Sequence, residues 1–286
     1  MDMPIVEGVR SIKADICNLN FWLEFIGQVD LVFHLAGNTS ISEAEKSPID
    51  NLISTISPIS HIVNASKILK RKPKVIFTST ATVYGMVSKM PVSESFETKP
   101  LTIYDLHKTF AEQYLQMANS LGLLNVTSLR LANVYGPSIN PSSSLDRGVI
   151  NRCVEKALKG ENLTMYGDGN YLRDYIYISD VINALLIAGS YEGLNGQIFN
   201  IGYGAGVTLA DIFQLIVSQV ESRSKISIKI DQMPWPENTA LTDKRNFVAN
   251  IEKFQTYTRW KPLMEIEKGV DLLISAVINE NSYEAN

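Results

Sequence analysis

The chain has 286 residues, of which 45% are hydrophobic and 20% charged, values that are ordinary for a globular protein with a sizeable core. Its formal net charge of −4 gives no reason to expect nucleic acid or an anionic membrane as a partner. Two cysteines are too few for a disulfide framework, no apolar run is long enough to cross a bilayer, and no signal peptide is evident. We therefore expect a cytoplasmic protein.

The first predicted elements are a strand, a helix and a second strand. Residues 9–16 are predicted to form a short strand with its apolar side chains turned inward, and residues 19–27 a helix. Residues 29–37 form a nearly unbroken apolar run that ends in glycine, which is typical of a central parallel strand covered on both faces. His34 lies inside this run, where a buried strand residue is the favoured interpretation over a ligand or a base.

The next segments continue an alternation of helix and strand. Residues 44–70 have helical periodicity, although Pro58 is expected to kink or split the helix. Residues 74–80 and 126–132 are two further β-rich runs. Strand, helix and strand at this spacing predict right-handed βαβ units and a parallel sheet.

A tyrosine and a lysine stand one helical turn apart within residues 103–121. Tyr104 and Lys108 are four residues apart, a spacing that places both on one face of a helix. The apolar residues that give this segment its helical period are Ile103, Leu106, Phe110, Tyr114, Met117 and Leu121. Gly122 follows, where a left-handed stop is favoured. An ammonium near a phenol lowers the pKa of the tyrosine, which suits it to move protons at a sugar hydroxyl or carbonyl. Alone, the pair favours a simpler interpretation, a surface tyrosine and lysine on an amphipathic helix.

Beyond Pro137 the composition changes, and a smaller mixed α/β lobe is predicted. The expected helices span residues 149–159, 180–188, 207–220, 251–258 and 266–277. The expected strands are residues 173–178 and the run in which Ile226, Ile228 and Ile230 alternate. The expected connections are a polar loop at 138–144, a glycine-rich turn region at 160–169 and a loop at 231–242. Thr208 is placed to cap the 207–220 helix.

Three predicted strands of the first half end in residues suited to a ligand crevice. These ends are Leu35-Ala36-Gly37, Ser79-Thr80 and Ala132-Asn133. In an open parallel sheet the ligand binds beyond the carboxyl ends of the strands. We expect these residues to meet the Tyr104 helix at that edge, with the second lobe facing them.

Seven motifs, in this order, resemble the extended short-chain dehydrogenase/reductase family, in particular its nucleotide-sugar epimerases and dehydratases. They are His-Leu-Ala-Gly at 34–37, Thr-Ser-Thr-Ala-Thr-Val-Tyr-Gly at 78–85, Tyr-x-x-x-Lys at 104–108, Arg-Leu-Ala-Asn-Val-Tyr-Gly-Pro at 130–137, Tyr-Gly-Asp-Gly at 166–169, Arg-Asp-Tyr-Ile-Tyr at 173–177 and Trp-Lys-Pro at 260–262. The resemblance spans about residues 14–262. It implies that residues 1–137 form a partial Rossmann dinucleotide-binding core, to which later segments return, and residues 138–286 mainly a substrate-binding lobe.

The resemblance also implies roles for residues at these positions. Tyr104 would be the acid/base, Lys108 would hold the nicotinamide ribose, and Thr80 would hydrogen-bond the reacting sugar oxygen. NAD is the implied cofactor, with NADP not excluded, and no metal is expected. The residues implied to contact the cofactor are Asp15, Ile16, Leu35, Ala36, Gly37, Tyr104, Lys108 and Ala132. Those implied to bind a nucleotide-diphosphate sugar are Thr80, Asn133, Val149 and Arg173.

Two of these substrate positions have a structural alternative. Arg173 could instead form a salt bridge between the lobes, with Asp174 or Asp180 as its partner. Asn133 could instead stabilise a turn through its side chain.

The residue types at positions 81 and 82 help to distinguish between the reactions that the resemblance allows. Relatives that eliminate water, and those that decarboxylate, place acidic residues directly after the hydroxyl residue, whereas Ala81 and Thr82 carry no carboxylate. Epimerisation at a sugar carbon or reduction of a keto sugar remains. The run from Thr80 to Gly85 is most similar to the 4-epimerase pattern.

The chain departs from the family at its start. The family opens with a strand and a G-x-x-G-x-x-G turn that binds pyrophosphate, and this sequence contains no such turn. The match begins at what corresponds to the third strand, so the sheet is expected to lack its first β-α-β unit and to expose an apolar edge. A truncated gene product, a deliberate fragment and a natural short form that re-pairs its N-terminal strand are three interpretations. Ala240 also stands where an arginine often contacts the substrate phosphate.

Two functional hypotheses follow from these features. The first is an NAD-dependent epimerase or keto-sugar reductase with a Thr/Tyr/Lys catalytic set. The alternative is a catalytically silent, truncated family member with a binding or interaction role only. A homodimer is expected in either case, since residues 44–70 and 103–121 carry apolar residues beyond those that one buried stripe requires.

Overall fold

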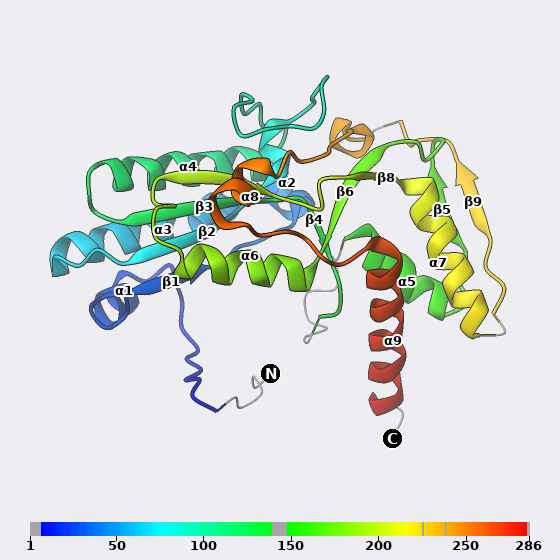
Figure 1. The fold of residues 1–286 in the computed structure, drawn as a ribbon, viewed down its shortest axis with the longest axis horizontal. Helices are drawn as coiled ribbons and strands as arrows, with labels where there is room; N and C mark the ends of the chain where they lie inside the picture. The colour runs from blue at the N-terminus through cyan, green and yellow to red at the C-terminus, as the bar shows by residue number, and fades with distance from the viewer. Residues whose placement is uncertain (1–6, 139–147, 225, 238, 285–286) are drawn as a thin grey trace.

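The computed structural model describes residues 7–138, 148–224, 226–237 and 239–284, and it is organised around a parallel β-sheet (Figure 1). Its strands hydrogen-bond in the order β1-β2-β3-β7. They are β1 (Leu31–His34), β2 (Lys74–Thr80), β3 (Asn125–Leu131) and β7 (Gln197–Ile201). Every pairing between them is parallel, so their carboxyl ends share one edge. The predicted parallel α/β sheet is confirmed.

Helices cover both faces of this sheet because successive strand residues point to opposite sides. Val75 and Phe77 of β2 pack in one core with side chains of α1, α3 and α4. Ile76, between them, packs in another core with side chains of α6 and α8. The helices are α1 (Leu19–Phe25), α3 (Pro48–Leu69), α4 (Ile103–Ser120), α6 (Ile178–Ser190) and α8 (Glu252–Thr258). Shorter helices are η1 (Ile26–Gln28), α2 (Ile41–Lys46), η2 (Ala81–Tyr84) and η4 (Leu241–Lys244).

A second lobe lies beside the sheet, at the right of Figure 1. Its strands form two small sheets, β4-β6-β8 and β5-β9. The strands are β4 (Asn133–Tyr135), β5 (Leu163–Tyr166), β6 (Leu172–Tyr177), β8 (Gly206–Thr208) and β9 (Ile230–Met233). The helices are α5 (Val149–Leu158), α7 (Leu209–Arg223) and α9 (Ile266–Glu284), which share one apolar core. Thr208 caps α7 as predicted, accepting a hydrogen bond from the backbone N–H of Asp211. Within the described part of the chain, no helix is both long and apolar enough to cross a membrane.

Two predictions for the N-terminal part are wrong. Residues 9–16 form no strand, and Val9 and Ile12 are 60% and 43% exposed, because no described strand pairs with this segment. The strand predicted as central, β1, lies at the edge of the sheet. Phe33 and Leu35 are exposed there, so this edge carries apolar side chains.

The prediction that Pro58 could split its helix is wrong. α3 runs through Pro58 to Leu69, and the break falls earlier, at Ser47 between α2 and α3. Pro58, Ile59 and Ile62 are all buried. Their packing outweighs the hydrogen bond that the proline removes, because tertiary burial supplies most helical stability in proteins.

Several strands fall outside the predicted ones, among them β5 and β7. β5 occupies part of the predicted glycine-rich turn region, and β7 follows α6 where no element is expected. β7 contains a buried Asn200, whose amide accepts from Tyr84 Oη at 2.7 Å and donates to Val92 O at 2.8 Å. A polar residue of that kind weakens a strand pattern until its partners are known. The alternation of isoleucines yields a strand only from Ile230 onward. The polar loop predicted at 138–144 lies outside the described residues apart from Ser138.

The predicted helix at residues 103–121 is confirmed as α4, and it is joined to the sheet by a buried ion pair. Arg130 of β3 donates to both carboxylate oxygens of Glu112, at 2.9 Å from Nε and 2.6 Å from Nη2. Their side chains are only 6% and 3% exposed. The guanidinium also lies over the ring of Tyr84, 4.8 Å from its centroid. Gly122 ends this segment with a φ of +71°, in the left-handed region predicted for a stop.

Removing one partner of this pair should be costly because it leaves a buried charge without its counterion. We expect Glu112→Gln to lower the free energy of unfolding by about 3–5 kcal/mol, as measured by urea denaturation. Glu97→Gln is the matched control, since Glu97 pairs with Lys99 at the surface, where such a pair contributes less than about 1 kcal/mol. Equal losses in the two variants would contradict the anchoring role of the buried pair.

Candidate active site

The carboxyl end of β2 carries a hydroxyl chain that ends on a buried carboxylate. Thr80 Oγ1 lies 2.9 Å from Thr82 Oγ1, and Thr82 Oγ1 donates to Asp105 Oδ1 on α4. The Thr80 hydroxyl also accepts from the backbone N–H of Thr82 at 3.2 Å, which caps η2. Thr80 is therefore fixed in orientation by its neighbours rather than free to rotate.

α4 presents Tyr104 and Lys108 at the same edge. Its N-terminus is capped by Thr102, which accepts from the backbone N–H of Asp105, so the helix begins directly before Tyr104. Lys108 Nζ donates to the carbonyl oxygen of Thr78 at 3.0 Å and lies 5.9 Å from the ring centroid of Tyr104. The predicted placement of both side chains on one helical face is what the structure shows.

The ammonium of Lys108 is deeply buried. Burial lowers the pKa of Lys108 to about 8, while the nearby carboxylate of Glu112 opposes that shift. His34 lies close by, stacked on Phe77 with ring centroids 5.9 Å apart. Burial and the charge of Lys108 lower the pKa of His34 to about 4, so its imidazole is neutral at pH 7. The interpretation of His34 as a buried strand residue is confirmed.

The residues implied to contact the cofactor fall into two groups. Leu35, Ala36 and Gly37 are exposed at the end of β1, and a Cβ placed on Gly37 would lie 3.8 Å from Lys108 Nζ. Ala132 follows β3 at the same edge of the sheet, and its N–H bonds the carbonyl oxygen of Ile201 at 2.8 Å.

Asp15 and Ile16 are in a turn rather than at the end of a strand. The Asp15 carboxylate accepts from the backbone N–H of Cys17, and Ile16 O accepts from Trp22 Nε1 at 2.7 Å. This turn packs against α3, where Cys17 O lies 3.0 Å from His61 Nε2. The structure therefore brings the first group to the Tyr104 edge and leaves these two residues in contact with a helix.

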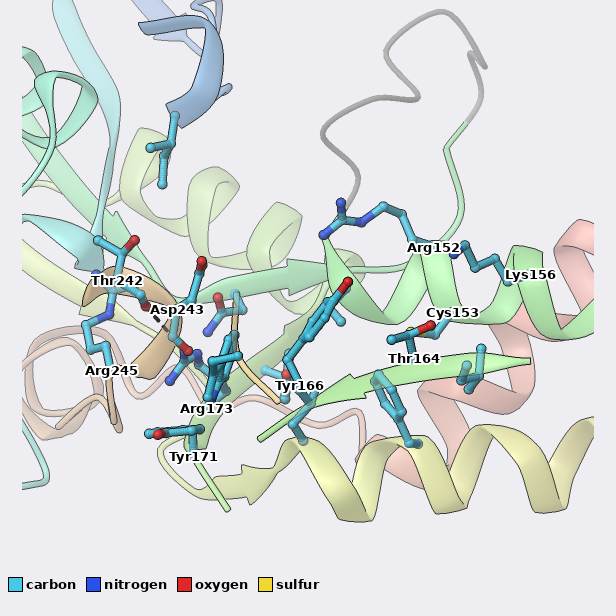
Figure 2. A pocket seen from close by; sticks show the side chains of 18 of the residues that line it. Arg152, Cys153, Lys156, Thr164, Tyr166, Tyr171, Arg173, Thr242, Asp243 and Arg245 are labelled. Atoms are coloured by element: carbon cyan, nitrogen blue, oxygen red, sulfur yellow. Dashed lines mark hydrogen bonds between the residues drawn. The ribbon is translucent and has the colours of Figure 1, made fainter. Parts of the chain in front are cut away.

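A cavity of about 620 Å³ opens between the two lobes and is lined by the predicted substrate residues Asn133, Val149 and Arg173 (Figure 2). Thr82 also lines it, which connects the cavity to the hydroxyl chain of Thr80. Tyr166, Tyr171, Arg152 and Lys156 line other parts of the wall. The cavity therefore has hydroxyl groups at one end, cations along its wall and aromatic rings beside them.

Arg173 is held by backbone carbonyls rather than by a carboxylate. Its Nη2 donates to Asp243 O at 2.8 Å and to Thr242 O at 3.4 Å. The salt-bridge alternative is wrong, because both of the carboxylates considered for it bind backbone N–H groups instead: Asp174 accepts from Tyr203, Gly204 and Ala249, and Asp180 from Leu263 and Met264.

The side chain of Asn133 makes one hydrogen bond within the protein and keeps one further polar atom that a ligand could contact. Its Nδ2 donates to the carbonyl oxygen of Asp174 at 2.9 Å, which joins β4 to β6. The side chain lines the cavity. Its amide oxygen is an additional acceptor there, so the turn-stabilising alternative and a ligand contact are compatible at this residue.

Sequence reasoning misses Arg245, a cavity residue that is only 7% exposed. Burial and the neighbouring charge of Arg173 lower the pKa of Arg245 to about 10, whereas Asp105 and Asp243 oppose the shift. Ala240, where the family pattern suggests an arginine, does not line the cavity. A bridge between Arg173 and Phe247 brings this distant segment to the site, and no local pattern announces that pairing.

Sequence reasoning also misses part of the aromatic wall of the cavity. The rings of Tyr166 and Trp235 are stacked with centroids 5.8 Å apart, and Lys244 Nζ lies 5.7 Å from the centroid of Trp235. The sequence marks Tyr166 as part of a motif, but Trp235 belongs to a segment read there only as a loop.

The polar residues at the carboxyl edge of the sheet fit the nicotinamide half of an NAD molecule. Tyr104, Lys108 and Thr80 form a polar cluster at the carboxyl edge of β2, which suits the nicotinamide and its ribose. Residues 1–286 contain no G-x-x-G-x-x-G turn, the usual source of donors to the pyrophosphate, and no described strand pairs with the outer side of β1.

The fold is that of a Rossmann-like α/β protein, and known proteins match this chain over most of its length. A model of the NAD dependent epimerase/dehydratase family matches residues 4–202. A UDP-N-acetyl-alpha-D-glucosaminuronate decarboxylase from Bacillus cytotoxicus is 34% identical over 269 residues, which cover 92% of this chain and 81% of that protein. A putative UDP-glucose 4-epimerase from Methanocaldococcus jannaschii is 27% identical over 263 residues, which cover 88% of this chain and 78% of that protein.

A solved structure shows the same architecture. The UDP-glucose 4-epimerase of Thermotoga maritima, crystallised with UDP-glucose, superimposes with a TM-score of 0.83 at 28% identity and covers 94% of this chain and 84% of that one. The chain belongs to the NAD-dependent epimerase/dehydratase family, which is part of the extended short-chain dehydrogenases/reductases. It is a family of enzymes acting on nucleotide sugars.

Because the pyrophosphate donors are absent, we expect residues 1–286 to bind NAD weakly or not at all. Each lost hydrogen bond to a charged group is worth about 1.5–3 kcal/mol, so losing two or three weakens binding by several orders of magnitude. Calorimetric titration with NAD measures this directly. A chimera that carries a relative's glycine-rich turn is the positive control. Micromolar or tighter binding by the chain alone would mean that another segment replaces the turn.

Proposed function

We propose that the protein is an NAD-dependent 4-epimerase of a nucleotide-diphosphate sugar, with reduction of a keto sugar as the alternative reaction. The observation that carries this proposal is the meeting of Tyr104, Lys108 and Thr80 at one sheet edge, where Thr82 links them to the cavity. The catalytically silent alternative finds less support, since the matched relatives are named as enzymes.

In this proposal Tyr104 removes the proton of the reacting sugar hydroxyl and returns it after the carbon is reduced again. Lys108 holds a positive charge one helical turn away, which favours the phenolate form. Thr80 contacts the reacting oxygen and fixes its position. NAD, when bound, accepts a hydride from the sugar carbon and gives it back to the other face.

The cavity suits a nucleoside diphosphate. Arg245 is buried and Arg173 is partly buried, and guanidinium groups bind phosphate oxygens in a planar, bidentate manner. Asn133 adds an amide, and the ring pair of Tyr166 and Trp235 offers an apolar wall for a base. The relatives named above are epimerases and a decarboxylase of UDP sugars, so UDP is the first nucleotide to test.

Epimerisation is favoured over decarboxylation or dehydration by the burial of the carboxylate at this end of the cavity. Asp105 lies behind Thr82 and is 0% exposed. The absence of an acidic residue at positions 81 and 82 therefore does not leave the hydroxyl chain without a carboxylate, which corrects the premise drawn from the sequence. A fully buried carboxylate, however, cannot contact the sugar to expel water or to hold a leaving group.

The proposal is tested at Tyr104 in a chimera that carries a relative's glycine-rich turn and therefore binds NAD. Tyr104→Phe should lower the turnover of UDP-glucose by about 10² to 10⁴, the usual contribution of a positioned acid/base, while NAD affinity changes little. Tyr114→Phe, on the same helix with its side chain 40% exposed, is the control and should keep its turnover. Near-normal turnover in Tyr104→Phe would sink the assignment.

We also propose that the protein is a two-fold homodimer formed through α3 and α4. Exposed apolar side chains lie on both helices: Ile49, Leu52 and Ile53 on α3, and Phe110, Tyr114 and Met117 on α4. The two helices pack side by side, with Tyr114 Oη 3.4 Å from Ser60 Oγ. Burying this face against a second copy would form a four-helix bundle.

Light scattering at micromolar concentration tests the dimer. The wild-type chain should have twice the monomer mass, and Met117→Asp should convert it to a monomer, because Met117 is 62% exposed on the proposed face. Leu186→Asp is the matched control, since Leu186 is 58% exposed on α6, across the sheet. A monomeric wild type, or equal effects of the two substitutions, would contradict the proposed interface.

A further inference from the structure

Asp105 of α4 lies at the end of the hydrogen-bonded series that starts at Thr80, the last residue of β2. Thr82 Oγ1 donates to its Oδ1, and Thr80 Oγ1 lies 2.9 Å from Thr82 Oγ1. Asp105 directly follows Tyr104 in the sequence, so this chain and the tyrosine approach the site from one turn of helix.

The donors and acceptors of this chain can be counted. The Oδ1 atom of Asp105 accepts the hydrogen bond from Thr82. Thr82 has a single hydroxyl proton, and that proton is donated to Asp105. In the contact between the two threonines the donor must then be Thr80. Thr80 therefore has no proton to offer a ligand.

Thr80 keeps one acceptor position. Of its two lone pairs, one accepts the backbone N–H of Thr82 at 3.2 Å, which leaves the other for a ligand. Hydrogen bonds are thus donated from Thr80 to Thr82 and from Thr82 to Asp105. The position that remains open, on Thr80, is an acceptor.

Asp105 makes this contact through one of its two carboxylate oxygens. Its Oδ2 is buried and has no hydrogen-bond partner among the described residues. Arg245, whose Nε and Nη1 are likewise buried without a partner there, interacts favourably with Asp105 through charge. The hydrogen bond from Thr82 is therefore the contact that ties this carboxylate to the strand end.

We propose that Asp105 is a positioning residue, which acts through Thr82 to hold Thr80 as a hydrogen-bond acceptor for the reacting hydroxyl of the sugar. The inference rests on the proposed function, since it places that hydroxyl at Thr80. A sugar with a hydroxyl at the reacting carbon can donate to Thr80, whereas one with a ketone or a fluorine there cannot. The site therefore selects for the alcohol form, and Tyr104 remains the donor for the keto form.

The test compares two ligands in calorimetric titrations of the chain without NAD: UDP-glucose and UDP-4-deoxy-4-fluoroglucose. Fluorine is close to a hydroxyl in size but cannot donate. The wild-type chain should bind UDP-glucose about tenfold more tightly, the equivalent of one hydrogen bond. In Thr82→Val and in Asp105→Leu the ratio should fall to a value between about one and about three, because neither variant keeps the whole relay and the proton of Thr80 can turn to the fluorine. Thr82→Ser keeps the hydroxyl and should keep the tenfold ratio.

A structural role of Asp105 predicts something different. As an acidic residue in the first turn of α4, it also stabilises the helix, so its loss can lower the melting temperature. Stability alone does not change a ratio of two affinities, and Thr82→Val provides a second variant that leaves Asp105 in place.

The outcomes separate the inference from the proposed function. If the wild-type chain binds neither ligand, the proposed substrate class is wrong and the inference falls with it. Equal affinities for the two ligands in the wild type would overturn the inference while leaving a UDP-sugar site intact. A tenfold ratio that persists in both Thr82→Val and Asp105→Leu would show that Thr80 is oriented by something other than Asp105.

Discussion

The buried ion pair between Arg130 and Glu112 is the interaction on which the rest of the candidate site depends. It joins β3 to the helix that carries Tyr104 and Lys108. Because both partners are removed from water, each needs the other, and α4 has one favourable position on the sheet. Glu112 also lies one turn beyond Lys108, where its charge limits how far burial lowers the pKa of the lysine. The anchoring of the helix and the charge state of its lysine are therefore coupled.

The parallel sheet turns separation along the chain into proximity at one edge. Thr80, the last residue of β2, lies opposite Leu131 of β3, and the residues just beyond these ends, Thr82 and Asn133, both line the cavity. The second lobe is held to this edge by Asp174, whose carboxylate accepts three backbone N–H groups. Burial raises the pKa of Asp174 to about 6, and those N–H groups limit the rise. The three hydrogen bonds of Asp174 thus restrain the position of the second lobe, while burial of the carboxylate carries a high cost of desolvation.

The electrostatics of the cavity follow from the same packing. Arg173 and Arg245 come from segments far apart in the chain, and both line the cavity. Burial, and then repulsion by the guanidinium of Arg173, lower the pKa of Arg245. Such a pair is balanced best by an anionic ligand, and the site is preorganised for one before it binds. The charge of Asp105 supplies part of that balance from within the protein.

Local signals in the chain were sufficient for the helix around Tyr104 and Lys108, for the stop at Gly122 and for the parallel sheet, because periodicity and turn chemistry act over a few residues. They were insufficient wherever the outcome depends on a distant partner. The segment at 9–16 has a strand pattern but no neighbour to pair with, and β1 became an edge for the same reason. Asp105 carries no signal of its own, since its meaning comes from Thr82, which only packing of α4 on β2 brings within hydrogen-bond distance. Burial and long-range pairing are properties of the folded chain, and they decide which of its polar residues form the site.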